Sequence, residues 1–226
     1  TMEDALAHGL PRPHTRLIFT VEEETRLEGA KRVAAHELAD RDFSVVFDHT
    51  GDAGLIVNEA PTYYDLRLAF QGKAAHAGMH PELGSNALLL AAKVLSMLPV
   101  GRVDAETTLN FGLVRGGQAV NAVPETVELL GELRGHNAKT LETVLGHIRG
   151  VAEAEAAQCK EAAYDLQAEV SFHGFALPPE HPGIMAIQAA MCACGVAPHL
   201  ERSNGGSDNN VFVARGVPGV VLSGAY

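Results

Sequence analysis

The sequence predicts an α/β fold in two parts: a domain with a parallel or mixed sheet, interrupted by an inserted α+β domain. Strand and helix patterns alternate at both ends of the 226-residue chain, as they do in parallel sheets. Between them the predicted order is βαββαβ, which is ferredoxin-like: a four-stranded antiparallel sheet backed by two helices. We therefore assign residues 1–60 and 174–226 to the first domain and residues 61–173 to the second.

The N-terminal part contains two apolar runs that we expect to be neighbouring strands. Residues 16–20 and 44–47 have the pattern of buried strands, and residues 27–39 between them have a helical pattern. A strand, a crossover helix and a second strand imply a parallel pair. Residues 1–9 are expected to be the last turns of a helix that ends at a glycine.

Acidic residues follow both of these runs. Glu22, Glu23 and Glu24 come after the first, and Asp48 ends the second. Ligands bind at the carboxyl ends of the strands in open α/β sheets, so these acids are expected to converge there. Adjacent carboxylates can divide the chemistry, one holding a metal and the other moving a proton. The alternative is a solvated acidic turn that leads into a helix.

The middle of the chain supplies the inserted domain. Its strands show alternation of apolar and polar residues, and its helices show apolar residues at helical spacing. The expected elements are strand 64–70, helix 84–98, strands 107–114 and 126–134, helix 138–157 and strand 165–172.

The α/β pattern resumes in the last part of the chain. We expect a helix over residues 183–194, a glycine-rich turn over 205–208 that opens a short helix to residue 214, and a strand over 217–222.

Composition excludes several classes of function. The chain is 46% hydrophobic and 20% charged, which is typical of a globular protein, and is long enough to bury a core. Its net charge of −11 argues against binding to nucleic acid or to anionic membranes. No apolar run approaches the roughly 20 residues of a membrane helix, and no secretory signal is visible. Three cysteines without metal-like spacing favour the cytoplasm.

Four segments together resemble a known family. They are Gly-Lys-Ala-Ala-His-Ala-Gly at 72–78, Gly-Gly-Gln-Ala-Val-Asn-Ala-Val-Pro-Glu at 116–125, Phe-Thr-Val-Glu-Glu-Glu-Thr at 19–25 and Gly-Gly-Ser-Asp-Asn-Asn at 205–210. These segments are similar to the di-zinc metallopeptidases and amidohydrolases that include peptidase T, glutamate carboxypeptidase and aminoacylase. The resemblance covers nearly all of the chain, and the peptidase T-like branch is nearest.

The resemblance implies zinc-dependent hydrolysis of an amide bond by two ions that share a bridging water and a carboxylate. Glu23 matches the general acid/base, which takes a proton from the water and delivers it to the leaving amine. Glu24 matches a ligand of one zinc ion and Asp48 a ligand of the other. The family usually has glycine at the position of Arg26, a difference that can reshape the loop after Glu24.

The middle segments carry further matches. His76 matches a histidine of the lid, or dimerisation, domain that reaches into the partner subunit's site and stabilises the oxyanion; the alternative is an interface histidine without a chemical task. Asn121 and Arg134 match residues that bind the substrate's polar end or carboxylate. Their alternatives are a turn residue and a surface salt bridge.

The glycine-rich turn near the C-terminus has two interpretations. The N–H groups of Gly205, Gly206 and Ser207 can seat a substrate carboxylate at a helix start. The alternative is an ordinary helix cap made by Ser207 or Asp208.

The resemblance also implies ligands that the chain does not contain. A His-x-Asp pair and a bridging aspartate are expected before Thr1, and a further histidine after Tyr226. Of five expected protein ligands only Glu24 and Asp48 are present, so we expect weak or absent zinc binding. The chain is therefore expected to be a piece of a longer enzyme and inactive on its own.

Three functions remain open at this stage. The first is a zinc-dependent exopeptidase or amidohydrolase of peptide or N-acyl amino acid substrates. The second is a non-catalytic dimerisation module, and the third is a metal-free small-molecule binding module. The resemblance implies a homodimer through the lid domain, with its sheet edge and the helix over residues 84–98.

Overall fold

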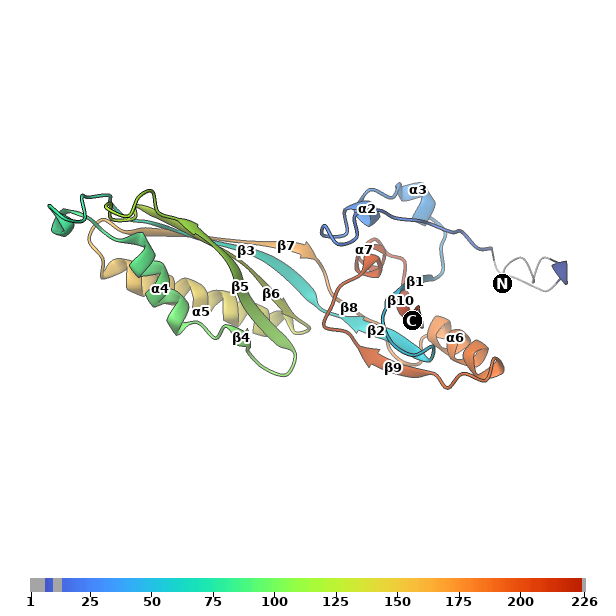
Figure 1. The fold of residues 1–226 in the computed structure, drawn as a ribbon. Helices are drawn as coiled ribbons and strands as arrows, with labels where there is room; N and C mark the ends of the chain where they lie inside the picture. The colour runs from blue at the N-terminus through green and yellow to red at the C-terminus, as the bar shows by residue number, and fades with distance from the viewer. Residues whose placement is uncertain (1–6, 10–13, 225–226) are drawn as a thin grey trace.

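The computed structural model describes residues 7–9 and 14–224 and contains two five-stranded sheets. Figure 1 shows them as two lobes side by side, each with its own helices. The chain crosses from the first lobe to the second at residues 60–62 and returns at residues 172–175. The expected helix over residues 1–9 falls largely outside the described residues.

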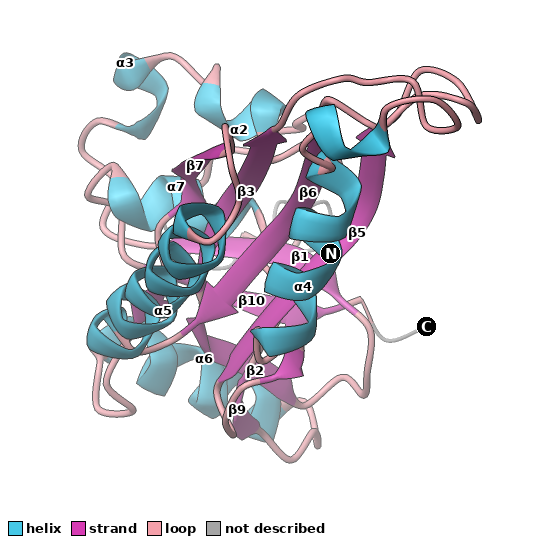
Figure 2. Cartoon of the chain, turned by 90° about the vertical axis from the view of Figure 1, so that its left-hand side faces the viewer, coloured by secondary structure: helices cyan, strands magenta, loops and turns pink. Residues whose placement is uncertain are grey.

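The second sheet is formed by the middle of the chain and is antiparallel throughout, in the order β4-β5-β6-β3-β7. The helices α4 and α5 pack on one of its faces (Figure 2), and all the expected strands and helices of this region form. Their bounds are β3 Thr62–Gln71, α4 Ala87–Met97, β4 Gly101–Arg102, β5 Thr107–Gly116, β6 Thr126–Gly135, α5 Ala138–Ala157 and β7 Ala163–Phe172, with a 3-10 turn at Pro81–Leu83.

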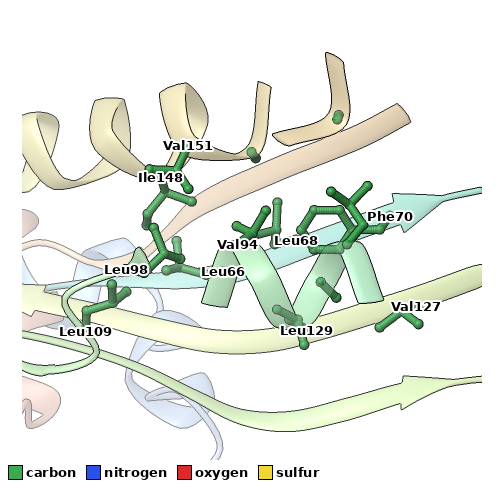
Figure 3. Packing of buried hydrophobic residues seen from close by; sticks show 14 of the residues in the cluster. Leu66, Leu68, Phe70, Val94, Leu98, Leu109, Val127, Leu129, Ile148 and Val151 are labelled. Atoms are coloured by element: carbon green, nitrogen blue, oxygen red, sulfur yellow. The ribbon is translucent and has the colours of Figure 1, made fainter. Parts of the chain in front are cut away.

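The core of this lobe explains why the pattern of its sequence was informative. Leu66, Leu68 and Phe70 alternate along β3 and face the helices, where they meet Val94 of α4 and Ile148 of α5 (Figure 3). Alternation in a strand and helical spacing in a helix each place apolar side chains on one face. Both patterns can therefore be recognised in the sequence without knowing which element packs against that face.

The first sheet is mixed and is assembled from both ends of the described chain. Strand β1 runs parallel to β10, β2 is antiparallel to β10 and β8, and β9 is parallel to β2. The bounds are β1 Ser44–His49, β2 Leu55–Ala60, β8 Phe175–Ala176, α6 Pro182–Ala193, β9 His199–Arg202, α7 Asp208–Ala214 and β10 Gly219–Ser223.

The expected strand over residues 16–20 is wrong. These residues are irregular, and Phe19 is 91% exposed. A strand exists only where a neighbour accepts its hydrogen bonds, and the ladder of β1 goes to β10 instead. Within residues 14–224, no strand pairs with the other edge of β1.

The single helix expected over residues 27–39 is also wrong. Two short helices take its place, α2 at Glu28–Lys31 and α3 at Ala35–Leu38. Leu27 has a left-handed φ of 61°, and Ala34 is extended, so neither can be an interior helical residue. No described helix has the length and apolarity needed to cross a membrane.

Candidate active site

Two carboxylates of the first lobe, Glu23 and Asp48, lie close enough to Glu24 and Asp208 to be affected by their charges. Glu23 and Glu24 lie in the loop before α2, Asp48 lies near the end of β1, and Asp208 is the first residue of α7. Burial raises the pKa of Glu23 to about 7, with further increases from the charges of Asp48, Glu24 and Asp208 and from a hydrogen bond with Asp48. A hydrogen bond joins Glu23 to Asp48, and the charge of Glu24 acts on both, so these three carboxylates lie close together, in agreement with the expected convergence.

Asp208 is the member of this cluster that the sequence interpretation missed as a site residue. Burial raises its pKa, and a hydrogen bond from the Thr20 hydroxyl opposes that increase. Burial and the charge of Asp208 also raise the pKa of Asp48. Burial is thus the largest cause of the raised pKa values of Glu23, Asp48 and Asp208, and neighbouring negative charges add to it for Glu23 and Asp48.

The raised pKa of Glu23 makes a prediction about stability. Its pKa in the folded protein, about 7, lies above the ordinary 4.5, so protonation favours the fold below pH 4.5 and this contribution disappears as pH rises through 7. The shift corresponds to about 3 kcal/mol at most, and solvent screening reduces it to about 1–2 kcal/mol. Urea unfolding of the chelator-treated protein at pH 5 and pH 7.5 measures the loss. Glu23→Gln should flatten this pH dependence, whereas Glu22→Gln should not; an unchanged slope in Glu23→Gln contradicts the prediction.

The carboxylates of this cluster are of the chemical type that binds divalent cations, but too few of them are arranged to hold one. Carboxylate oxygens suit such cations, and Oδ1 of Asp208 is buried without a hydrogen-bond partner. Within residues 7–9 and 14–224, however, no three His, Cys, Asp or Glu side chains are arranged to hold a metal. Glu24 and Asp48 therefore amount to part of a coordination shell.

Arg26 occupies a strained position beside the cluster. Its φ is 66°, in the left-handed region that favours glycine, and its guanidinium lies 2.9 Å from Asp65 of β3. This is the position at which the resemblance implies glycine. The loop therefore keeps a glycine-like backbone here even though the residue is arginine.

His76 lies in the other lobe. Figure 1 shows segment 72–86, between β3 and α4, at the end of the second sheet that points away from the first sheet. Nδ1 of His76 accepts hydrogen bonds from the N–H groups of Gly78 and Met79, each at 3.2 Å. The neutral ring must then carry its proton on Nε2, which leaves an N–H donor on an exposed side chain. A single chain does not bring His76 to the acidic cluster.

Asn121 lies beside the histidine loop. Its carbonyl oxygen accepts a hydrogen bond of 2.9 Å from the N–H of Ala77, and His76 forms an isolated bridge with Ala122. The structure therefore joins the segments 72–78 and 116–125, which are separate in the sequence, into one surface. Asn121 itself is exposed.

Arg134 is already paired. Nε and Nη2 donate to the two carboxylate oxygens of Glu132 at 3.0 and 2.9 Å, and the guanidinium lies over the ring of Tyr63 at 4.6 Å. These contacts leave Nη1 for a further acceptor. The intrachain ion pair matches the alternative interpretation of this residue.

The glycine-rich segment offers fewer free donors than expected. The N–H of Gly205 donates to Ser203 Oγ and the N–H of Ser207 donates to Asn210 Oδ1, each at 3.0 Å. Ser207 and Asn210 form a capping box on α7, as the helix-cap alternative proposed. Of the three expected donors, only the N–H of Gly206 is not used by these side chains. The segment nevertheless borders a small cavity that Asp48 also lines.

Comparisons with known proteins agree with the resemblance. Residues 62–159 match the family model described as a peptidase dimerisation domain. The chain is 34% identical over 224 residues to the uncharacterized protein YqjE of Bacillus subtilis, covering 99% of this chain and 59% of that protein. It is 29% identical over 226 residues to the succinyl-diaminopimelate desuccinylase of Nitrosospira multiformis, covering 92% and 57%.

Solved structures show the same similarity. A tripeptidase from Staphylococcus aureus superposes with a TM-score of 0.92 at 31% identity, covering 100% of this chain and 60% of that one. The aminopeptidase PepT from Bacillus cereus gives a TM-score of 0.81 at 33% identity, covering 90% and 54%. The chain thus spans between about half and three-fifths of the length of these relatives.

Proposed function

Because this chain belongs to the metallopeptidase and amidohydrolase family that includes peptidase T, we propose that its acidic cluster takes part in the metal-dependent hydrolysis of a peptide or related amide bond. The observation that carries the proposal is the coupling of Glu23 to Asp48 and Asp208. A group with a pKa near 7 is suited both to take and to give a proton at neutral pH.

The proposed role of each acidic residue follows from its position in the sequence and in the cluster. Glu23 takes a proton from the attacking water and passes it to the leaving amine nitrogen. Glu24 and Asp48 would hold zinc, which supplies Lewis-acid polarisation and a more acidic water when it is bound. The relatives are longer than this chain, and we propose that their additional residues carry the remaining ligands.

The second lobe has a separate proposed task. We assign residues 61–173 to a ferredoxin-like lid and dimerisation domain, supported by the strand order β5-β6-β3-β7 with α4 and α5 on one face. Nε2–H of His76 would stabilise the oxyanion in the partner subunit's site. Asn121, Nη1 of Arg134 and the N–H of Gly206 would contact the substrate, a peptide or N-acyl amino acid.

The homodimer is proposed to form through α4 and the free edge of β5. Strand β4 pairs with β5 only at Thr108 and Leu109, so the rest of this edge has no partner among the described strands. Helix α4 lies beside β5 (Figure 2), and Leu88 and Leu89 of α4 and Val114 of β5 are exposed apolar residues. An apolar strand edge is a template for pairing with a second copy.

A zinc titration followed by calorimetry tests the proposed site. We expect this chain to bind Zn²⁺ weakly, through carboxylates, and Asp48→Asn to abolish that binding, because Asp48 is one of the two proposed ligands. Asp52→Asn, in the loop after β1, is the matched control and should bind as the wild type does.

The other outcomes of the titration contradict different parts of the proposal. Tight binding of two ions with cleavage of a tripeptide would support hydrolysis but would contradict the proposal that further residues carry the remaining ligands. Absence of binding in the wild type would favour the non-catalytic dimerisation module instead.

A further inference from the structure

The first turn of α7 is built from three consecutive polar residues that are almost completely buried. Asp208 is 5% exposed, Asn209 0% and Asn210 1%. Burying a polar side chain costs free energy unless it is hydrogen-bonded, so three in a row call for an explanation. Helix capping accounts only for Asn210, through its bond to Ser207.

Each of the three side chains ties α7 to a different segment of the chain. Asp208 Oδ2 accepts a hydrogen bond from the hydroxyl of Thr20, directly before the acidic loop. Asn209 Oδ1 accepts one of 2.8 Å from Ser44 Oγ, at the start of β1. Asn210 Nδ2 donates to the carbonyl oxygen of His173 at 2.8 Å, where the chain returns from the second lobe.

The helix that holds these contacts is itself fixed. Val211 and Phe212 are buried in one hydrophobic cluster with Leu27, Ala30 and Leu38. The acidic loop is therefore attached to α7 at both ends, through the Thr20 hydroxyl before Glu23 and through Leu27 after it.

Two backbone contacts make the loop compact between these attachments. The N–H of Leu27 donates to the carbonyl oxygen of Glu23 at 2.9 Å. A Cβ at Gly29 would lie 2.0 Å from the carbonyl oxygen of Val21, so the backbones approach as closely as glycine allows. Thr20 and Leu27, the two residues that contact α7, are thus joined to Glu23 by a short and compact stretch of backbone.

We propose that the first turn of α7 is the positioning element of the acidic site. Asp208 positions Glu23 through Thr20, and Asn209 positions the strand that leads to Asp48 through Ser44. The inference deepens the proposed function and rests on it for its catalytic meaning. Asp208 does more than accept a hydrogen bond, because its second oxygen is buried without a partner beside two other carboxylates.

Amide hydrogen exchange of the full chain tests the positioning role without substrate or metal. Thr20→Val removes the hydroxyl and preserves the shape of the side chain, so the Leu27 amide should exchange about tenfold faster. Thr20→Ser keeps a hydroxyl and should restore the wild-type rate. Ser44→Ala is the matched control, because it removes the Asn209 contact and should leave the Leu27 amide unchanged. An unchanged Leu27 rate in Thr20→Val overturns the inference.

A second variant distinguishes a role of Asp208 at the acidic site from a purely structural role. Asp208→Asn keeps an acceptor for Thr20 but removes the charge, so Leu27 exchange should stay at the wild-type rate while the affinity for Zn²⁺ falls about fivefold or more. Unchanged affinity in Asp208→Asn would reduce Asp208 to a structural residue and overturn its role at the site. If the wild type binds no Zn²⁺, the proposed function fails, and the exchange experiment alone decides whether α7 positions the loop.

Discussion

Replacing Glu23 with glutamine is expected to lower kcat for the proposed amide hydrolysis about 10³-fold, with little change in KM. Glutamine keeps the size of the side chain and can still accept a hydrogen bond, but it cannot take a proton from the attacking water. Positioned acid–base groups contribute about 10²–10⁴-fold to rates. The assay uses this chain, or, where the zinc titration shows a partial site, this chain extended with the additional residues of its longer relatives.

The matched control is Glu22→Gln. Glu22 is the preceding residue, is exposed, and pairs with Arg32 at 3.6 Å, away from the coupled carboxylates. This variant should retain wild-type kcat, and both variants should unfold at wild-type temperature or above near neutral pH, since Glu23→Gln removes a repelled charge. Equal loss of activity in the two variants would contradict the acid–base role of Glu23 and would show that activity depends on the conformation of the whole loop.

Prediction from sequence was most successful where structure depends on local pattern. The elements of the second lobe were expected because Leu66, Leu68 and Phe70 alternate and because the helices carry apolar residues at helical spacing. The mixed first sheet was harder to predict, because its strands come from distant parts of the chain. The short strand β2 was missed although Leu55-Ile56-Val57 is a continuous buried apolar run.

The candidate site, too, could be predicted only in part from the sequence. The sequence correctly predicts that Glu23 and Asp48 lie together, but they do not do so as the ends of neighbouring strands, because residues 16–20 are not a strand beside β1. Asp208 was considered only as a helix cap. The sequence did contain a signal: Asp-Asn-Asn directly precedes the apolar run Val-Phe-Val, so polar residues share a short helix with its buried face. Only the three-dimensional contacts to Thr20 and Ser44 show what they do.

Replacing Val114 with lysine is expected to convert the proposed homodimer to a monomer. Val114 pairs with Leu129, which is buried beneath the helices, and cross-strand partners share a face. Val114 nevertheless remains 63% exposed because the β5 edge has no strand beyond it here. A lysine at this edge opposes pairing through its charge and its hydration.

The second sheet has another free edge, and it supplies the control. Strand β7 has no partner beyond it among the described strands, but it presents Asp165, Gln167 and Glu169, whose polar side chains disfavour pairing. Gln167→Lys adds the same charge there and should leave the dimer intact. Light scattering at high protein concentration, with circular dichroism to verify folding, should show twice the chain mass for the wild type and Gln167→Lys and one chain mass for Val114→Lys. The reverse pattern would place the interface on β7, and a monomeric wild type would remove the partner subunit through which His76 is proposed to act.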